Sequence, residues 1–282
     1  MNPPHLLIVG CGDIGIRVGL KLVGLGWQVS AVRRHSEHLP DAFSRYSGDY
    51  TVEGGLASIA ALRPDWCLFT PLPDGRDLAG YQRGFRDSVE RIAATGVLDR
   101  VRRLFYVSST RVYAEQDGGW VNESSALTES DAQGMAIVEG EARCASLAPT
   151  TVVRPAGVYG DSPGMLLQRV ASGQRSADPG RLSNRIHRAD LAGLIAYLLE
   201  GGADGRELPD VINAADDAPT PIGEVEEWLA ARLGVVLDVT LGANDRGGRR
   251  VSNQRLHELG YSLQFPDWRS GYEQQLQARA DG

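Results

Sequence analysis

The sequence predicts an α/β protein with a doubly wound parallel sheet and a small C-terminal α+β lobe. Three observations support this fold class. A short apolar run, a glycine-rich turn and a helical pattern open the chain, strands and helices then alternate, and the composition changes after about Arg154. Strands that alternate with helices form parallel sheets covered on both faces. We therefore expect a first domain at residues 1–155 and a smaller lobe at 156–282, which sends segments back to the first domain.

The opening of the chain predicts a βαβ unit. Leu6–Val9 is a continuous apolar run that ends at Gly10, as buried parallel strands do. Apolar side chains recur at helical spacing across residues 14–25, and Gly26 ends that pattern. Trp27–Val32 then reads as the second strand, which completes strand, turn, helix and strand.

The alternation continues along the chain. Further helices are expected at Leu56–Leu62, Leu78–Ala94, Ala132–Leu147, Asp190–Leu199 and Ile222–Leu233. Further strands are expected at Asp65–Thr70, Val101–Ser108, Thr150–Val153 and Val211–Ile212, with a pair within Val235–Leu241. The C-terminal third would cover the carboxyl edge of the sheet, and a crevice there would be the ligand site.

The bulk composition excludes several classes of protein. The chain has 282 residues, 42% of them hydrophobic and 23% charged, which is typical of a soluble globular protein. A net charge of −7 disfavours sequence-independent binding of nucleic acid. No apolar run reaches the length of a membrane span, and the N-terminus does not resemble a secretory signal. The three cysteines are far apart, which favours buried thiols in a reducing cytoplasm over disulfides or zinc.

The turn at residues 10–15 carries the strongest functional signal. Gly10, Gly12 and Gly15 fit G-x-G-x-x-G after a strand and at the start of a helix. The first glycine allows the tight turn, the second lets a pyrophosphate approach the backbone, and the third lets helix and strand pack closely. Free amides near Asp13 and Ile14 and the helix dipole would hold the phosphates. This predicts a Rossmann-type dinucleotide site.

The end of the second strand indicates which dinucleotide binds. NAD-binding chains of this pattern carry an acidic residue here for the ribose hydroxyls. In this sequence Arg33 and Arg34 stand at the end of the strand, and the first acidic residue after them is Glu37. Arginine matches the oxygens of a phosphate, so the pair favours NADP over NAD, although two solvated loop arginines remain the alternative. Thr70 and Pro71 lie at the end of the strand predicted at Asp65–Thr70, where the backbone would line the same dinucleotide.

Several further segments resemble the extended short-chain dehydrogenases/reductases, the NAD-dependent epimerase/dehydratase family. The family's motifs vSSxxVYG, GDxT, RPxxVYG, fihVxD, yNv and kLxxLGw are matched, in that order, by residues 105–113, 48–51, 154–160, 185–190, 211–213 and 256–261. The match covers nearly the whole chain. It implies that Asp49 lies by the adenine, that Ser108 contacts the cofactor, and that Pro155 and Val158 close over the nicotinamide.

The sequence departs from this family at its proton-transfer pair. The family carries Tyr-x-x-x-Lys about twenty-five residues after a catalytic Ser or Thr, which Ser109 matches. Gln133 stands at the Tyr position and Ile137 at the Lys position, while Glu141 fits a later helix glutamate. The only lysine of the sequence is Lys21, so no such pair is present. Glutamine does not titrate, and the resemblance is therefore to a divergent branch.

Other residues are weaker candidates. Ser109 would hydrogen-bond a substrate oxygen or cap the strand end, and Tyr113 is the nearest phenol in sequence, with a packed tyrosine as the alternative. Arg185 would bind an anionic substrate or lie at the surface. His187 is interpreted as structural and Asp190 as the N-cap of the next helix.

These observations predict an NADP-binding, or alternatively NAD-binding, oxidoreductase or sugar-epimerase/dehydratase-like protein of the cytoplasm. It would act on a small molecule, with acid and base groups other than those of the family, and form a homodimer by analogy. The alternatives are an NADP-binding sensor without redox catalysis, or a fold that binds no cofactor.

Overall fold

The computed structural model describes residues 3–161, 164–242 and 248–280. These residues pack into two compact units, each built from several segments of the chain. The first contains residues up to Val112, Leu127–Arg154 and Ala192–Ile212, and the second contains the remaining segments. Residues 113–126, which fall within the first predicted domain, group with the second unit, and residues 192–212 group with the first.

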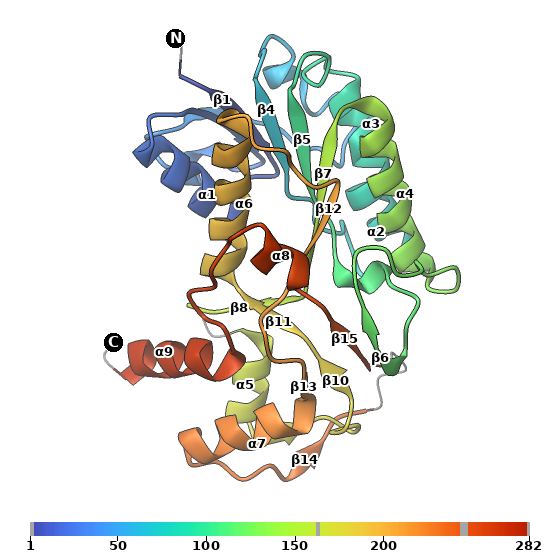
Figure 1. Ribbon diagram of the computed structural model, residues 1–282, viewed down its shortest axis with the longest axis vertical. Coiled ribbons are helices and arrows are strands. Elements are labelled where there is room, and N and C mark those ends of the chain that lie inside the picture. Colours follow the sequence, from blue (N-terminus) through green and yellow to red (C-terminus); the bar gives the residue numbers. More distant parts are fainter. Residues whose placement is uncertain (1–2, 162–163, 243–247, 281–282) are drawn as a thin grey trace. The chain divides into compact units, whose positions relative to one another are not determined.

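The first unit is built on a seven-stranded sheet, which confirms the predicted fold class (Figure 1). Its strand order is β12-β7-β5-β4-β1-β2-β3. Neighbouring strands from β7 to β3 are all parallel. The strands are β1 His5–Val9, β2 Gln28–Arg33, β3 Ser44–Ser47, β4 Trp66–Phe69, β5 Arg103–Val107, β7 Thr150–Pro155 and β12 Val211–Ala214. The carboxyl ends of β5, β4, β1 and β2 therefore lie side by side, and ligands bind at such an edge in this class of fold.

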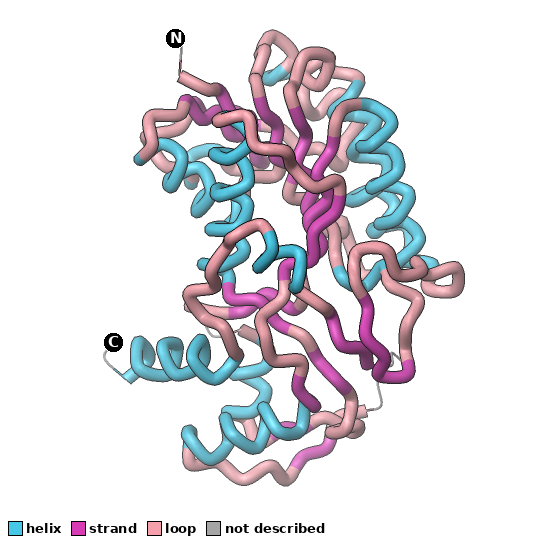
Figure 2. Tube along the Cα trace, viewed as in Figure 1, coloured by secondary structure: helices cyan, strands magenta, loops and turns pink. Residues whose placement is uncertain are grey.

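Helices cover both faces of this sheet (Figures 1 and 2). One face carries α1 (Asp13–Gly24) and α6 (Arg188–Ala203), and the other carries α2 (Leu78–Tyr81), α3 (Ser88–Ala93) and α4 (Ala132–Leu147). A π-helical segment, Gln82–Asp87, joins α2 to α3, so the predicted helix over residues 78–94 is continuous but irregular. There, Gly140 of α4 leaves room for the Phe85 carbonyl, which accepts a hydrogen bond from the Tyr106 hydroxyl at 3.2 Å.

One sequence prediction for the first unit is wrong, and one of its strands was not predicted. The helix expected at Leu56–Leu62 is only a single 3₁₀ turn, Ala57–Ile59, because the backbone is tightly folded at Gly55 and Pro64 follows. The strand β3 was not predicted, because it is an edge strand whose mostly exposed residues lack apolar alternation. The core of the unit comes from the strands that were predicted: Leu6–Val9 and Cys67–Phe69 are fully buried.

The second unit combines four small two-stranded sheets with helices. The sheets pair β8 (Gly157–Tyr159) with β11 (Arg185–His187), β10 (Leu182–Ser183) with β13 (Thr220–Pro221), β9 (Gln174–Arg175) with β14 (Val239–Thr240), and β6 (Asp117–Val121) with β15 (Gly248–Val251). The helices are α5 (Met165–Ala171), α7 (Ile222–Leu233), α8 (Gln254–Glu258) and α9 (Trp268–Ala280). Only two residues of the range 235–241 form a strand, so the strand pair expected there is not found.

This unit has a hydrophobic core of its own. Tyr159, Leu167, Val225, Leu229 and Trp268 are among its buried members, and the Trp268 indole donates a hydrogen bond to Thr220 at 2.9 Å. The sequence pattern correctly predicted α7, because its apolar residues recur at helical spacing and Gly234 ends it with a φ of +66°.

Two classes of site find no support in the described residues. All three cysteines are free and buried, and burial raises the pKa of Cys11 and of Cys67 to about 12, so both are protonated and inert near neutral pH. In the described part of the chain there is no cluster of metal-ligating side chains. No helix among the described residues has the length and apolar character needed to span a membrane.

Candidate functional site

The three glycines of the first turn have three different environments. Gly10 has a φ of +72°, and a Cβ there would lie 2.9 Å from the Tyr50 ring. A Cβ on Gly15 would lie 2.9 Å from a methyl group of Ile8, so this glycine brings α1 close to β1. Gly12 differs from both, because its φ is −90° and the nearest atom to a Cβ would be the Gly10 carbonyl oxygen at 3.9 Å. The fold therefore needs glycine at positions 10 and 15, while Gly12 keeps a space that no side chain fills.

A cavity of about 240 Å³ lies against this turn. It runs from the start of α1 across the end of β2 to the loops that follow β3 and β4. Its walls comprise Gly10, Cys11, Gly12, Arg33, Arg34, His35, Gly48, Asp49, Tyr50, Thr51, Leu72, Pro73 and Asp74. The structure thus brings together five of the residues predicted to bind the cofactor: Gly10, Gly12, Arg33, Arg34 and Asp49.

The two arginines of the cavity have no partner among the described residues, whereas its two aspartates are paired or hydrogen-bonded. Within the described residues, neither Arg33 nor Arg34 makes a side-chain hydrogen bond or an ion pair. Asp74 is paired with Arg83 at 2.9 Å, and the Asp49 carboxylate accepts hydrogen bonds from the amide and hydroxyl of Thr51 at 2.8 and 2.6 Å. The uncompensated charge at the end of β2 is therefore positive and suits a phosphate.

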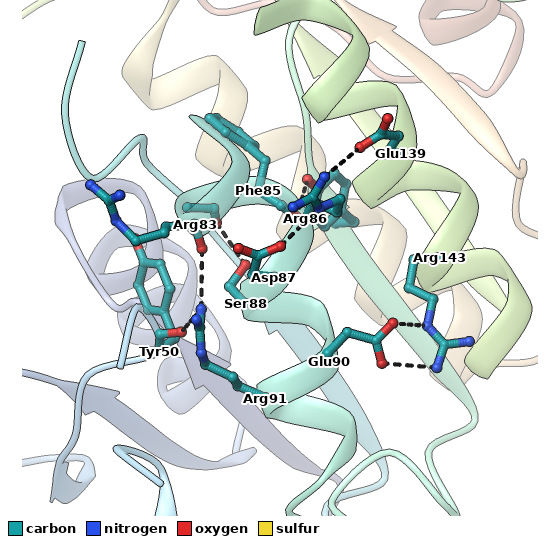
Figure 3. Close-up of polar contacts among 12 residues, drawn as sticks. Tyr50, Arg83, Phe85, Arg86, Asp87, Ser88, Glu90, Arg91, Glu139 and Arg143 are labelled. Carbon is teal, nitrogen blue, oxygen red and sulfur yellow. Dashed lines mark hydrogen bonds and ion pairs between the residues drawn. The ribbon is translucent and has the colours of Figure 1, made fainter. Parts of the chain in front are cut away.

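Tyr50 is a wall residue that sequence reasoning missed. Its hydroxyl accepts a hydrogen bond from the Leu72 amide at 3.0 Å, and its ring stands edge-on to Phe69 with centroids 5.2 Å apart. Burial raises the pKa of this phenol. Arg91 of α3 donates to the carbonyls of Tyr50 and Arg83 at 3.4 and 3.5 Å, which ties the cavity wall to the helix behind it (Figure 3). The position of Tyr50 between Asp49 and Thr51 of the GDxT motif was the sequence signal that could have identified it.

The other residues predicted to contact the cofactor near the turn have mainly local roles in the structure. Asp13 begins α1 and pairs with Arg17 at 3.0 Å, one turn along the helix. Ile14 is half-buried, and Pro71 is buried. The Thr70 hydroxyl donates to the Gly10 carbonyl at 2.7 Å, so it braces the first glycine against β4. None of these four lines the cavity, and their contact with a cofactor stays a prediction.

Ser108 belongs to a buried polar network. Its hydroxyl donates a hydrogen bond to Glu141 of α4, and the Arg154 guanidinium donates to both oxygens of that carboxylate at 3.0 and 2.6 Å. Arg154 and Glu141 are 4% and 6% exposed. The glutamate that matches the family's helix residue therefore links β5, α4 and β7 in the core.

The two candidate catalytic residues have different surroundings. Ser109 is half-buried, and its hydroxyl oxygen accepts a hydrogen bond from the Arg111 amide at 3.1 Å. Tyr113 belongs to the second unit and is fully buried, and its hydroxyl donates to Asn213 at 2.6 Å. Tyr113 thus fits the alternative of a packed tyrosine whose hydroxyl is satisfied, and Ser109 remains accessible in part.

The start of α4 holds no acid or base at the expected positions. The Gln133 amide donates to the Arg76 carbonyl at 2.6 Å, and Ile137 is 1% exposed in the core. Nearby, Arg111 donates from two nitrogens to Asp131 at 2.5 and 2.7 Å and from a third to the Tyr81 hydroxyl at 3.2 Å. Neither Arg111 nor Tyr81 was singled out from the sequence. Arg111 stands at a variable position of the vSSxxVYG motif, and Tyr81 lies outside every family motif.

Residues of the second unit that were predicted to act at the site are mostly buried there. Arg185 is 5% exposed and lies in the unit's interior with Asp216, whose pKa burial raises to about 7 despite the nearby guanidinium. The alternative of a surface arginine is therefore wrong. His187 is 1% exposed against Phe265 and Tyr159, as a structural histidine would be.

Asp190 is not an N-cap. The helix begins two residues earlier, at Arg188, and the Asp190 carboxylate accepts hydrogen bonds from the amides of Gln264 and Phe265 at 2.6 and 2.9 Å. Pro155 ends β7, and Val158 lies in β8 with 43% of its surface exposed. Whether these two residues meet a nicotinamide stays a prediction.

The fold and its glycine turn define a class of protein. The chain has the fold of the extended short-chain dehydrogenases/reductases, and its structural neighbours are members of the NAD-dependent epimerase/dehydratase family. No family model matches the sequence.

Individual relatives cover nearly the whole chain. It is similar to protein YeeZ of Escherichia coli, with 26% identity over 92% of this chain and 96% of the relative. A structure described as a "putative NAD-dependent epimerase/dehydratase" from Methylobacillus flagellatus has a TM-score of 0.81 and 26% identity, over 99% of this chain and all of the other. A structure of MoeE5 in complex with UDP-glucuronic acid and NAD has a TM-score of 0.81 and 21% identity, over 99% of this chain and 100% of that one. At this identity the likeness shows the shared fold alone.

Proposed function

We propose that this chain binds a nicotinamide dinucleotide, NADP in preference to NAD, and acts as a sugar-epimerase- or dehydratase-like oxidoreductase on a small molecule. The observation that carries the proposal is the combination of an open space at Gly12 with two arginines that have no partner among the described residues, all in one cavity. A packed fold gains nothing from either feature, whereas a pyrophosphate and a 2′-phosphate would use both.

The residues of the cavity suit the adenosine and pyrophosphate part of such a group. Amides at the start of α1 would hold the pyrophosphate, Arg33 and Arg34 the 2′-phosphate, and the loop around Asp49 and Tyr50 the adenosine. Along the sheet edge, β2 is three strands from β5, or about 14 Å. An extended dinucleotide bound at the turn would therefore reach the end of β5, where Ser109 follows the strand. When bound, the nicotinamide supplies or accepts a hydride.

The name of the Methylobacillus flagellatus structure, an NAD-dependent epimerase/dehydratase at 26% identity, supports the coarser part of the proposal, NAD-type binding in an epimerase-like fold. A second function is favoured by one specific observation. The positions of the family's Tyr and Lys hold a glutamine bonded to a backbone carbonyl and a buried isoleucine. A cofactor-binding sensor without redox chemistry would have this arrangement, and consumption of NADPH with a small carbonyl compound or nucleotide sugar would exclude it.

The preference for NADP is tested by a double substitution. We expect Arg33→Asp with Arg34→Ala to lower the affinity for NADPH at least tenfold more than the affinity for NADH, because a carboxylate repels the 2′-phosphate and accepts ribose hydroxyls. Fluorescence titration of both nucleotides measures this. As a matched control, Arg63→Ala removes a guanidinium outside the cavity that donates hydrogen bonds to the carbonyls of Ala60 and Leu62. Equal losses for the two nucleotides would contradict the role of the arginine pair.

A further inference from the structure

One phenol in the first unit is held by a guanidinium close to the start of α4. Arg111 Nη1 donates to the Tyr81 hydroxyl oxygen at 3.2 Å, and the guanidinium carbon lies 5.1 Å from the centre of the Tyr81 ring. The ring also stacks on Phe85, with centroids 5.7 Å apart and planes 23° from parallel. The ring is half-buried and fixed from two directions.

The guanidinium itself is anchored. Two of its nitrogens donate to the two carboxylate oxygens of Asp131, the residue directly before α4. Burial opposes the charge on Arg111, but the hydrogen bonds and charge of Asp131 outweigh it and raise the pKa of Arg111. Arg111 is therefore a permanent cation with a set direction, as a lysine beside a catalytic phenol would be.

The place of this cluster matches the place of the missing pair. Arg111 follows β5 and shares a hydrogen bond with Ser109, and Asp131 stands two residues before Gln133, where the family carries its tyrosine. The Tyr81 hydroxyl accepts from Arg111, which leaves its own hydrogen to donate, and no acceptor for it is found in the described residues. The Tyr81 phenol, from α2, and the Arg111 cation, from the segment after β5, thus lie together near the carboxyl end of β5, where the family's pair would act.

We propose that Tyr81 transfers the proton in this chain, with Arg111 as its positioning residue. In reduction of a carbonyl, the Tyr81 O–H bond would break and a new O–H bond would form on the substrate oxygen, and a bound reduced dinucleotide would supply the hydride that the carbonyl carbon gains. The positive guanidinium stabilises the negative charge left on the Tyr81 oxygen, and water returns the proton. Oxidation of an alcohol runs in the opposite direction. This inference rests on the proposed function.

Chemical nitration of the whole chain tests it without a known substrate. Tetranitromethane nitrates the rings of accessible tyrosines, and a guanidinium that donates to the phenol oxygen stabilises the negative charge that forms on that oxygen during the reaction. Tyr46 is the internal control, since it is also half-buried and, among the described residues, its ring and hydroxyl make no contact with a guanidinium. We expect mass spectrometry to show Tyr81 nitrated at least fivefold faster than Tyr46. Arg111→Gln should remove that difference, and Arg111→Lys should restore part of it.

The dinucleotide then gives a second readout. Saturating NADP should slow nitration of Tyr81 severalfold and leave the rate at Tyr46 unchanged. If NADPH binds in a separate fluorescence titration but Tyr81 reacts no faster than Tyr46, or equally fast in Arg111→Gln, this inference fails and the proposed function stands. If NADPH does not bind, both fail. Circular dichroism and an unchanged rate at Tyr46 show that each variant is folded.

Discussion

The glycine turn and the start of α4 lie in the same unit and have diverged differently from the family. At the turn every residue of the pattern is in place, and one of them, Gly12, serves nothing in the fold. At α4 the residues that would carry out chemistry are replaced, while Glu141, which packs in the core with Ser108 and Arg154, is retained. The chain therefore keeps the residues proposed to bind the cofactor at a place separate from the positions where the family's proton-transfer pair is replaced.

The difference also shows how each region can be tested. A residue kept for a ligand can be changed without loss of stability, whereas a residue kept for packing cannot. Substitutions on both sides of the comparison should therefore separate effects on folding from effects on binding.

The largest effect is expected at the buried network of α4. Arg154→Leu would leave the Glu141 carboxylate buried without its ion-pair partner, and we expect the free energy of unfolding to fall by about 3–5 kcal/mol. Urea denaturation measures the change. The matched control is Arg143→Leu, on the same helix as Glu141. The partner of Arg143, Glu90, is exposed (Figure 3), and loss of this pair should cost less than about 1 kcal/mol. Equal effects of the two substitutions would show that the buried network adds no stability.

The missing pair should resist restoration at one of its two positions. Ile137→Lys places an ammonium in the core, where Ile137 is 1% exposed, and we expect a loss of about 3 kcal/mol. Gln133→Tyr changes a half-buried side chain and removes one hydrogen bond, so it should cost about 1 kcal/mol. Thermal denaturation compares them. An Ile137→Lys protein as stable as the parent would mean that α4 can still accept the family's lysine.

The smallest effect on stability, and the sharpest contrast, is expected at the turn. Gly15→Val would press against Ile8 and should cost about 1–3 kcal/mol. Gly12→Val should leave the melting temperature almost unchanged, because its side chain meets only open space, yet it should lower nucleotide affinity more than a hundredfold. Loss of stability at Gly12 of the same size as at Gly15 would mean that the space is needed for folding.

Much of the first unit could be predicted from the sequence, because buried parallel strands and amphipathic helices leave local signals. Ala132–Leu147 was predicted to the residue. The exposed edge strand β3 and the 3₁₀ turn at Ala57–Ile59 leave weaker signals, since their conformations depend on neighbours distant in sequence. The same reason explains Asp190, whose position before a helical pattern suggested a cap, although its partners are amides more than seventy residues away.

The residues of the candidate site likewise include some that local motifs predicted and some that depend on contacts between distant parts of the sequence. Gly10, Gly12, Arg33, Arg34 and Asp49 could be found because short motifs follow successive strands whose ends meet at one edge. The contact between Tyr81 and Arg111 could not be found, because it joins α2 to the segment after β5 and neither residue belongs to a motif that implies the other.

The central claim is that the first strand-to-helix turn holds the diphosphate of a nicotinamide nucleotide. Calorimetric titration of the full chain with NADP tests it most directly, with the Gly12→Val protein titrated in parallel. We predict saturable binding of one nucleotide per chain, and none to the equally stable variant. Binding of equal strength to both proteins, or binding of neither NADP nor NAD to the parent, would contradict the account.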